Sequence, residues 1–380
     1  MHNTLQRMKL TFMKKGILLS LITILSLQVS AQDGIIRPGQ LWLDTDGTHI
    51  NAHGGGVLLH EGTYYWFGEH KSERTSNAMV GITCYASTDL TTWKNMGVAL
   101  PVSQERGNEI ERGCIMERPK VIYNPTTKKF VMYFHLELRH RGYDAARFGV
   151  AVSDRPEGPY QYLYSGRANA GKWPIEFSKQ EIEVADSFKM SDYEEWWTPR
   201  WTRAIRRGLF IKRDFEGGQM SRDMTLYVDD DGKAYHIFSS EDNLTIHIAE
   251  LTPDFLHHSG RYTRLSPAGH NEAPAIFKHD DTYWMITSGC TGWDPNEARM
   301  FSAPSIWGPW VQHPNPCVGP RSEITFGGQS TFVLSLPDGR FIFMADIWRP
   351  FHPIDARYIW LPITFNDGIP VITWQDEWKI

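Results

Sequence analysis

The segment Gly62-Thr63-Tyr64-Tyr65-Trp66-Phe67-Gly68 is the first of five stretches in the chain that share one pattern. Each stretch begins in a turn and continues as an aromatic-rich run about as long as a β-strand. The other four are Lys129–His135, Gly232–Phe238, Asp281–Thr287 and Gly339–Ala345. This repetition indicates that one β unit occurs five times along the chain.

A second recurring phrase follows several of these strands. In Ser87–Trp93, Ser153–Tyr160 and Ser302–Trp310 a strand ends in serine, a turn follows, and an aromatic residue packs back. Units of short strands that recur every ~50–60 residues are typical of propeller blades. We therefore predict an all-β fold, a five-bladed β-propeller, over residues 32–380. An irregular β-sandwich is the alternative, although it would not need five matched units.

One segment, from about residue 165 to 218, interrupts the β pattern. Its charged and aromatic stretches, Lys179–Asp186 and Glu194–Trp201, favour two or three short helices inserted before the third repeat. Long insertions tend to lie on the functional face of such folds. Trp196, Trp197 and Trp201 could stack on sugar rings, or they could pin the insertion to the propeller, which we expect for most of them.

The N-terminus has the pattern of a secretory signal peptide. Lys14 and Lys15 supply positive charge, Gly16–Val29 is an almost uninterrupted apolar run, and Val29–Ala31 is a small-residue cleavage site. We expect residues 1–31 to be removed and the protein to be exported, to a periplasm or outside the cell. No second apolar run is long enough to span a bilayer, so we expect no membrane attachment after cleavage.

Composition narrows the partners and cofactors. A net charge of −5 and a pI near 6.3 give no electrostatic footprint for nucleic acid. The spacing of the cysteines matches no zinc motif, and we expect no cofactor and no bound metal. An exported chain permits disulfides, and isolated buried thiols are equally compatible with the four cysteines, Cys84, Cys114, Cys290 and Cys317.

The stretch His270–Ile276 carries the first candidate for catalysis. It places Glu272 before an Ala-Pro step, and Pro274 should push Ala273 towards an extended conformation. An apolar run that reads as a buried strand follows. A carboxyl group held this way is a candidate general acid with a pKa raised by desolvation. A surface glutamate in a turn is the alternative.

Three further polar residues occupy similar places in other repeats. Glu117, Asp223 and Gln329 each lie at the entry to an apolar strand, as Glu272 does. In a propeller the innermost strands point the same end at the central axis, so equivalent positions should converge there. Each residue alone could cap a turn or form a surface ion pair, but four at one phase of the repeat favour a shared site.

Several motifs resemble glycoside hydrolase family 43, and most closely its exo-β-1,3-galactanase branch. The resemblance covers nearly the whole chain after the N-terminal segment, apart from the insertion. The motifs that carry it are Glu117–Val121, Ser221–Asp223, Glu272–Pro274, Gly292–Asn296, Trp348–Pro350 and Arg357–Trp360.

This resemblance implies a five-bladed propeller and a hydrolysis that inverts the anomeric centre. By position, Glu272 matches the general acid, Asp223 the carboxylate that tunes and orients it, and Glu117 a further essential carboxylate. The base Asp that most of the family carries in the first blade is missing from Asn51–Val57. The galactanase branch also lacks it and has a glutamine, here Gln329, thought to hold the attacking water. A neutral amide is a poor base, so proton abstraction would need an imidic-acid tautomer or help from Glu117.

The resemblance leaves the substrate open between three readings. The first is an exo-acting hydrolase that releases galactose from arabinogalactan-like oligo- or polysaccharide. The second is an α-L-arabinofuranosidase or β-D-galactofuranosidase. The third is a propeller that only binds glycan, which the joint presence of Glu272, Asp223 and Glu117 argues against. Residues expected to bind the sugar are His53, Glu69, Tyr143, Asn243, Trp293, Arg349 and Arg357.

Overall fold

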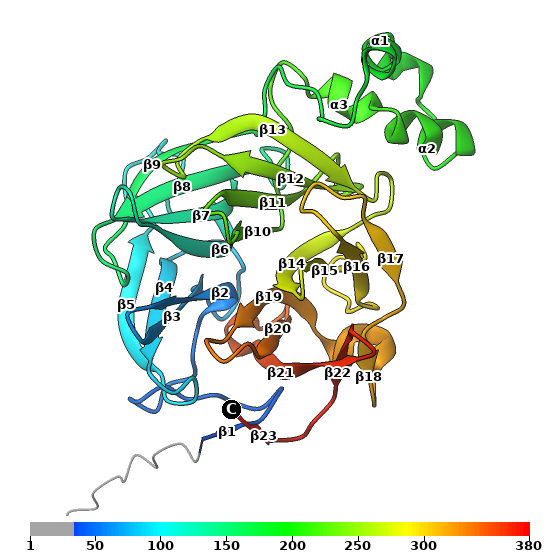
Figure 1. The fold of residues 1–380 in the computed structure, drawn as a ribbon. Helices are drawn as coiled ribbons and strands as arrows, with labels where there is room; N and C mark the ends of the chain where they lie inside the picture. The colour runs from blue at the N-terminus through cyan, green and yellow to red at the C-terminus, as the bar shows by residue number, and fades with distance from the viewer. Residues whose placement is uncertain (1–33) are drawn as a thin grey trace, which may run out of the picture.

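The computed structural model describes residues 34–380, and this part of the chain forms six β-sheets. Five of the sheets are blades arranged around a central axis, so the predicted five-bladed β-propeller is confirmed (Figure 1). The predicted signal peptide, residues 1–31, lies outside the described residues.

The first four blades are antiparallel four-stranded sheets whose strands follow one another in the sequence. Blade 1 contains β2 (His53–His60), β3 (Thr63–Glu69), β4 (Gly81–Ser87) and β5 (Lys94–Pro101). Blade 2 contains β6 (Ile115–Asn124), β7 (Lys129–Glu137), β8 (Arg147–Ser153) and β9 (Gln161–Gly166). Blade 3 contains β10 (Met224–Val228), β11 (Ala234–Ser240), β12 (Thr245–Leu251) and β13 (His258–Leu265). Blade 4 contains β14 (Glu272–His279), β15 (Thr282–Ser288), β16 (Arg299–Ala303) and β17 (Val311–His313).

Blade 5 has one extra strand. It contains β19 (Gln329–Ser335), β20 (Phe341–Ile347), β21 (Arg357–Asn366) and β22 (Ile369–Thr373), and β18 (Cys317–Val318) pairs with β22 in parallel. The short 3₁₀ turns Ser322–Gly327 and Pro353–Asp355 lie before β19 and β21. A separate two-stranded sheet joins β1 (Ile35–Ile36) to β23 (Trp378–Lys379), which holds the two ends of the described chain together.

The five repeats found in the sequence are the second strands of the five blades, β3, β7, β11, β15 and β20. The first strand of each blade lies nearest the axis. These inner strands contact one another in the closed order β2, β6, β10, β14, β19 and back to β2. Equivalent positions of the repeat are therefore brought to one axis.

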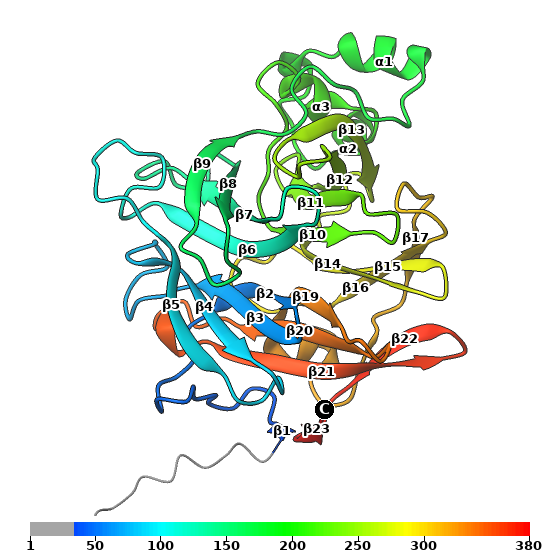
Figure 2. The same ribbon diagram turned by 60° about the vertical axis from the view of Figure 1, so that its left-hand side comes forward.

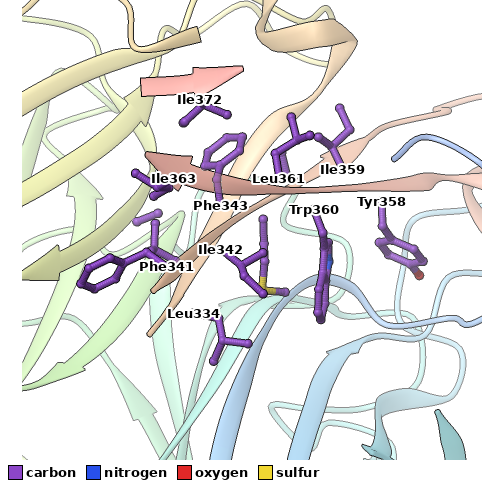
Figure 3. Close-up of a cluster of buried hydrophobic side chains, with 14 of the residues drawn as sticks. Leu334, Phe341, Ile342, Phe343, Tyr358, Ile359, Trp360, Leu361, Ile363 and Ile372 are labelled. Carbon is purple, nitrogen blue, oxygen red and sulfur yellow. The ribbon is translucent and has the colours of Figure 1, made fainter. Parts of the chain in front are cut away.

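The hydrophobic core lies between neighbouring blades. Separate clusters join β3 to β7, β7 to β11 and β11 to β15, and a fourth joins blade 5 to blades 1 and 4. Figure 3 shows part of this fourth cluster, including Trp360 of β21. Its ring centroid lies 4.9 Å from that of Trp66 and 5.9 Å from that of Trp93, both of blade 1. Burying such a side chain contributes about 1.5–3 kcal/mol, so these contacts help to close the ring.

The predicted insertion is helical, and it separates blades 2 and 3. It contains α1 (Lys179–Asp186), the 3₁₀ turn Met190–Asp192, α2 (Pro199–Arg206) and α3 (Leu209–Arg213). In both views these helices lie together at the edge of the propeller, next to β13 (Figures 1 and 2). Among the described residues, none of the helices is long and apolar enough to cross a membrane.

The cysteines take the second of the two states that the sequence left open. Cys84, Cys114 and Cys317 are buried free thiols, and Cys290 is a half-buried one. The stability of the described propeller therefore comes from its packing, with no contribution from disulfides.

Candidate active site

The candidate site lies at the end of the axis where the inner strands begin, which we call the entry face. Because neighbouring strands in a blade are antiparallel, the second strand of each blade ends at this same face. Strand starts and the loops that follow the second strands enclose a cavity of about 250 Å³. It is lined by Glu69, Lys71, Glu117, Arg118, His135, Tyr143, Arg222, Asp223, Asn243, Glu272, Gly292, Trp293, Gln329 and Trp348.

The size of this cavity limits what it can hold. Sites for drug-sized ligands typically measure roughly 300–1,000 Å³. A cavity of about 250 Å³ suits one small molecule, such as a single sugar ring, and not the middle of a long chain. The geometry therefore favours binding at the end of a polymer.

The four strand-start residues predicted to converge do so. Glu272 and Gln329 are the first residues of β14 and β19, Glu117 is the third residue of β6, and Asp223 immediately precedes β10. All four side chains line the cavity. Their individual catalytic roles stay predictions.

A backbone bulge places two of the carboxylates. Arg118 and Ala273, which directly follow Glu117 and Glu272, have φ angles of 54° and 53°. At both places the pairing register with the next strand shifts. Bulges of this kind often lie next to active sites, where they re-aim a side chain. A left-handed non-glycine residue costs on the order of 1–3 kcal/mol, which the surrounding contacts must offset.

The conformation of Ala273 corrects one prediction. We expected Pro274 to force an extended conformation on Ala273, but its φ is in the left-handed region. The bulge decides the conformation instead, and it is fixed from the neighbouring blade because the Ser330 hydroxyl donates to the Ala273 carbonyl at 2.6 Å. The buried strand predicted after Glu272 is confirmed as β14.

Glu272 has the properties expected of an acid. Burial, together with the negative charge of Asp223, raises its pKa to about 7, although Arg118 acts in the opposite direction. The Asn243 amide donates to its Oε1 at 2.6 Å and orients the carboxyl group. Asp223 is itself held by an ion pair with Arg118 at 2.8 Å. A carboxyl with this pKa is largely protonated just below neutral pH and can donate its proton.

Glu117 is the opposite kind of carboxyl. Burial alone would raise its pKa, but His135 and the charge of Lys71 lower it to about 2. The Tyr143 hydroxyl donates to Glu117 Oε1 at 2.8 Å, and His135 Nδ1 lies 3.2 Å from Oε2. His135 also contacts Glu137 through Nε2 at 2.9 Å. Glu117 is therefore a fixed negative charge facing the cavity.

The amide of Gln329 has a defined orientation. Its Oε1 accepts from the Arg118 guanidinium at 2.5 Å and from the Trp348 indole N–H at 2.8 Å. Both partners are obligate donors, so the oxygen must face them. Its Nε2 donates to the Ser288 hydroxyl at 2.9 Å. The second N–H of the amide is left to interact with a molecule in the cavity.

Where most of the family carries the base aspartate, at the start of β2, this chain has glycines, and the side chains of Glu69 and Lys120 pack against them. A Cβ on Gly54 would lie 2.3 Å from Oε1 of Glu69, and a Cβ on Gly56 would lie 2.5 Å from the Lys120 side chain. The glycines thus make room for two buried charged side chains beside the axis. Glu69 accepts from the Arg118 backbone N–H at 3.0 Å and forms an ion pair with Lys71.

Four of the residues predicted to bind the sugar lie in the cavity wall, namely Glu69, Tyr143, Asn243 and Trp293. Tyr143 and Trp293 are also partly exposed, at 42% and 40%.

The other three do not line this cavity, and their predicted role in sugar binding stays a prediction. His53 has no exposed surface, because it is packed against Tyr358 with ring centroids 5.3 Å apart. Arg349 and Arg357 both form ion pairs with Asp355, outside the cavity wall.

Sequence reasoning missed several residues of the wall. Arg118, Arg222 and Trp348 lie inside motifs that carried the family resemblance, beside the residues that were chosen. His135 closes the second repeat, and Lys71 lies just beyond the first. Position at the end of a repeat is the signal that could have found these two, because every second strand ends at the entry face.

One group of side chains comes close enough to consider a metal. Ligand atoms of Glu117, His135 and Asp223 lie within 4.8 Å of one another. Burial would lower the pKa of His135, but Glu117 and Glu137 raise it to about 9. His135 lies between Glu117 and Glu137 as in an ion-pair network, and a metal ion bound there would have to displace the imidazole proton.

One carboxyl group with a raised pKa and a second with a lowered pKa, both lining one small cavity, are typical of a glycoside hydrolase site. The family model for glycosyl hydrolases family 43 matches residues 192–370. A solved family 43 β-1,3-galactosidase, bound to galactodeoxynojirimycin, is 60% identical over 91% of this chain and 100% of its own, with a TM-score of 0.89. The chain belongs to glycoside hydrolase family 43, as the motifs predicted.

Two exo-β-1,3-galactanases are more distant relatives. The enzyme from Phanerochaete chrysosporium, solved with β-1,3-galactotriose, is 32% identical over 91% of this chain and 68% of its own, with a TM-score of 0.72. The enzyme from Clostridium thermocellum is 32% identical over 92% of this chain and 67% of its own, with a TM-score of 0.73. A comparison with curated protein sequences gave no match.

Proposed function

We propose that this protein is an exo-acting β-1,3-galactosidase that releases terminal galactose from the β-1,3-galactan of arabinogalactan-type polysaccharide. The observation that carries the proposal is Glu272, a carboxyl with a pKa near 7 that faces a cavity for one sugar ring. The galactose specificity is supported by the activities of the relatives, foremost the β-1,3-galactosidase that is 60% identical. The furanosidase and glycan-binding readings have no comparable support.

In the proposed reaction, Glu272 donates its proton to the glycosidic oxygen as the bond to the leaving sugar breaks. Burial, together with the negative charge of Asp223, keeps Glu272 protonated near neutral pH. The positive charge that develops on the galactose ring is stabilised by ionised Glu117, which lines the same cavity as Glu272.

Water then attacks from the face opposite Glu272. Gln329 orients it by donating its second amide N–H, because the amide oxygen is already bound to Arg118 and Trp348. The water becomes strongly acidic as it bonds to the cationic ring, so even a weakly basic carboxylate such as Glu117 can take its proton. This division assigns positioning to Gln329 and proton acceptance to Glu117.

The substrate is tested by incubating the purified protein with β-1,3-galactobiose, with arabinogalactan and with nitrophenyl furanosides. The proposal expects free galactose from the first two substrates. Arabinose or galactofuranose as the product would support a furanosidase instead, and no product with measurable glycan binding would support a binding propeller.

We also propose that the protein acts after export, to a periplasm or outside the cell. The support is the charged and apolar pattern of residues 1–31 in the sequence. N-terminal sequencing of the mature protein should find a chain that starts after Ala31, and an intact N-terminus in the cytoplasm would contradict this.

A further inference from the structure

The helical insertion exposes two of its tryptophans. Trp197 is 62% exposed and Trp196 is 43% exposed, whereas Trp201 is 1% exposed. Trp201 therefore pins the insertion, the role that we expected for most of the three tryptophans, whereas Trp196 and Trp197 leave part of their rings open to solvent. The two exposed rings pack around it, with centroids 5.0 Å (Trp197) and 5.3 Å (Trp196) from the Trp201 centroid. Large aromatic side chains left in solvent and grouped in this way are typical of binding surfaces.

Helix α2, which directly follows Trp197 and Thr198, is anchored at both of its ends. Thr198 caps α2 directly after Trp197, because its hydroxyl accepts the Trp201 backbone N–H at 3.2 Å. At the other end of α2, Arg264 donates to the carbonyls of Ile205 and Arg206 at 2.9 and 3.0 Å. The same guanidinium is bound to the buried Glu241 carboxylate, so α2 is anchored to the propeller. Trp197 is thus held in place before any ligand arrives, which lowers the entropy cost of binding.

Trp197 lies close to the candidate acid, Glu272. The Trp197 ring packs on His270 with centroids 4.7 Å apart, and His270 is two residues before Glu272. The insertion core also contains Leu244, whose neighbour Asn243 donates to Glu272. His270 lies in the β13–β14 loop and Leu244 in the β11–β12 loop, and both loops are at the entry face. Trp197 is therefore on the same face as the cavity, on the side where Glu272 lies.

The leaving part of the substrate must lie on that side. A general acid protonates the oxygen between the cleaved sugar and the rest of the chain, so the chain extends from the pocket past Glu272. We propose that Trp197 is a platform for the part of the galactan that lies beyond the first leaving sugar, so that a disaccharide does not reach it. The proposal rests on the proposed function. An indole face suits the C–H face of a galactose ring, and an exposed ring next to the acid offers such a face.

A polar hollow of the insertion reaches Thr198, the residue directly after Trp197, and its chemistry suits a sugar ligand. It has a volume of about 270 Å³, and its wall includes Asp192, Glu195, Thr198 and Arg200. Carboxylate, hydroxyl and guanidinium groups are the partners that sugar hydroxyls need, while the ring supplies the apolar contact. Aromatic surface beside polar side chains fits a glycan better than it fits an apolar ligand.

The test compares Trp197→Ala with wild type on two substrates, β-1,3-galactobiose and a β-1,3-galactan oligosaccharide of five or more units. Phe351→Ala is the matched control, because Phe351 is 99% exposed and lies in the β20–β21 loop of another blade at the same face. We expect Trp197→Ala to leave kcat/KM on the disaccharide unchanged and to lower kcat/KM on the oligosaccharide roughly two- to twelvefold, through a higher KM. Phe351→Ala should leave both values unchanged.

Failure of the platform is distinct from failure of the proposed activity. Equal kcat/KM for wild type and Trp197→Ala on the oligosaccharide, with both substrates cleaved, would overturn the platform alone. An equal loss on both substrates would also overturn it, because it would indicate damage to the acid. If wild type released no galactose from either substrate, the result would contradict the proposed function and, with it, the role of Trp197 as a platform.

Discussion

The indole N–H of Trp348 donates to the amide oxygen of Gln329 at 2.8 Å. With the Arg118 guanidinium on the same oxygen, both lone pairs of the amide oxygen are used. An imidic-acid tautomer would place a proton on this oxygen, next to the permanent positive charge of Arg118 and facing two donors. The contacts therefore disfavour Gln329 as a base and favour it as a group that positions water through its nitrogen.

Gln329→Ala should lower kcat by roughly 10²-fold or more, because the water loses its orienting donor. Gln329→Glu should keep more activity, since a carboxylate can accept from Arg118, Trp348 and the Ser288 hydroxyl and is itself a base. Steady-state rates on β-1,3-galactobiose test both variants. If Gln329→Ala kept near wild-type activity and Glu117→Gln were inactive, Glu117 alone would both position the attacking water and accept its proton.

The stereochemistry of the reaction provides a separate test. Water that attacks from the face opposite Glu272 inverts the anomeric centre. Proton NMR of the first-formed sugar should therefore detect α-galactose from the β-linked substrate before mutarotation. Retention of the β configuration would exclude this mechanism. Azide or formate added to Gln329→Ala should restore part of its activity by acting as an external nucleophile or base.

Glu272→Gln should lower the rate on β-1,3-galactobiose by roughly 10²–10⁴-fold, because the variant has no proton to donate to the leaving oxygen. The fold should be kept, since the glutamine oxygen can still accept from Asn243. A nitrophenyl galactoside, whose leaving group needs little protonation, should lose much less activity. Equal losses on the two substrates would speak against the acid role.

Asp223→Asn should move the alkaline limb of the pH–rate profile to lower pH. The acid works while Glu272 is protonated, so wild-type activity should fall as pH rises through about 7. Removing the negative charge of Asp223 makes ionised Glu272 less unfavourable and lowers its pKa. Asp230→Asn, on the exposed turn between β10 and β11, is the control and should leave the limb in place. Lost activity with an unmoved limb would indicate that Asp223 binds substrate instead.

The sequence predicted the fold because the repeated strand is a local signal. Gly62–Gly68 and its four counterparts carry the turn and the aromatic run in consecutive residues, and one interface between blades repeats around the ring. The same reason explains why the sequence revealed four site residues, Glu117, Asp223, Glu272 and Gln329. They occupy equivalent positions in their repeats, and equivalent positions come together at one end of the propeller axis.

The remaining parts of the site depend on contacts between distant residues. Arg118 looks like an ordinary residue before a proline, yet it reaches across the axis to Gln329, which is 211 positions away. The left-handed Ala273 contradicts the usual effect of proline because a hydroxyl from another blade fixes the bulge. His53, for its part, resembles a polar site residue but faces the core. No local pattern contains this information.

The His135–Glu117 pair also predicts how stability depends on pH. The pKa of His135 is raised from 6.5 to about 9 in the folded state, so its contribution is fully present below pH 6.5 and is lost as pH rises through about 9. A shift of this size corresponds to a few kcal/mol, on the order of 1.4 kcal/mol per pH unit. His135→Gln should therefore melt well below wild type at pH 6, and the gap should narrow between pH 6.5 and 9.5. His140→Gln, which changes an exposed histidine on the β7–β8 loop, is the control for the substitution itself. A gap between His135→Gln and wild type that stays constant over this range would mean that His135 is neutral when folded, and Lys71 would then be the positive charge that keeps Glu117 ionised.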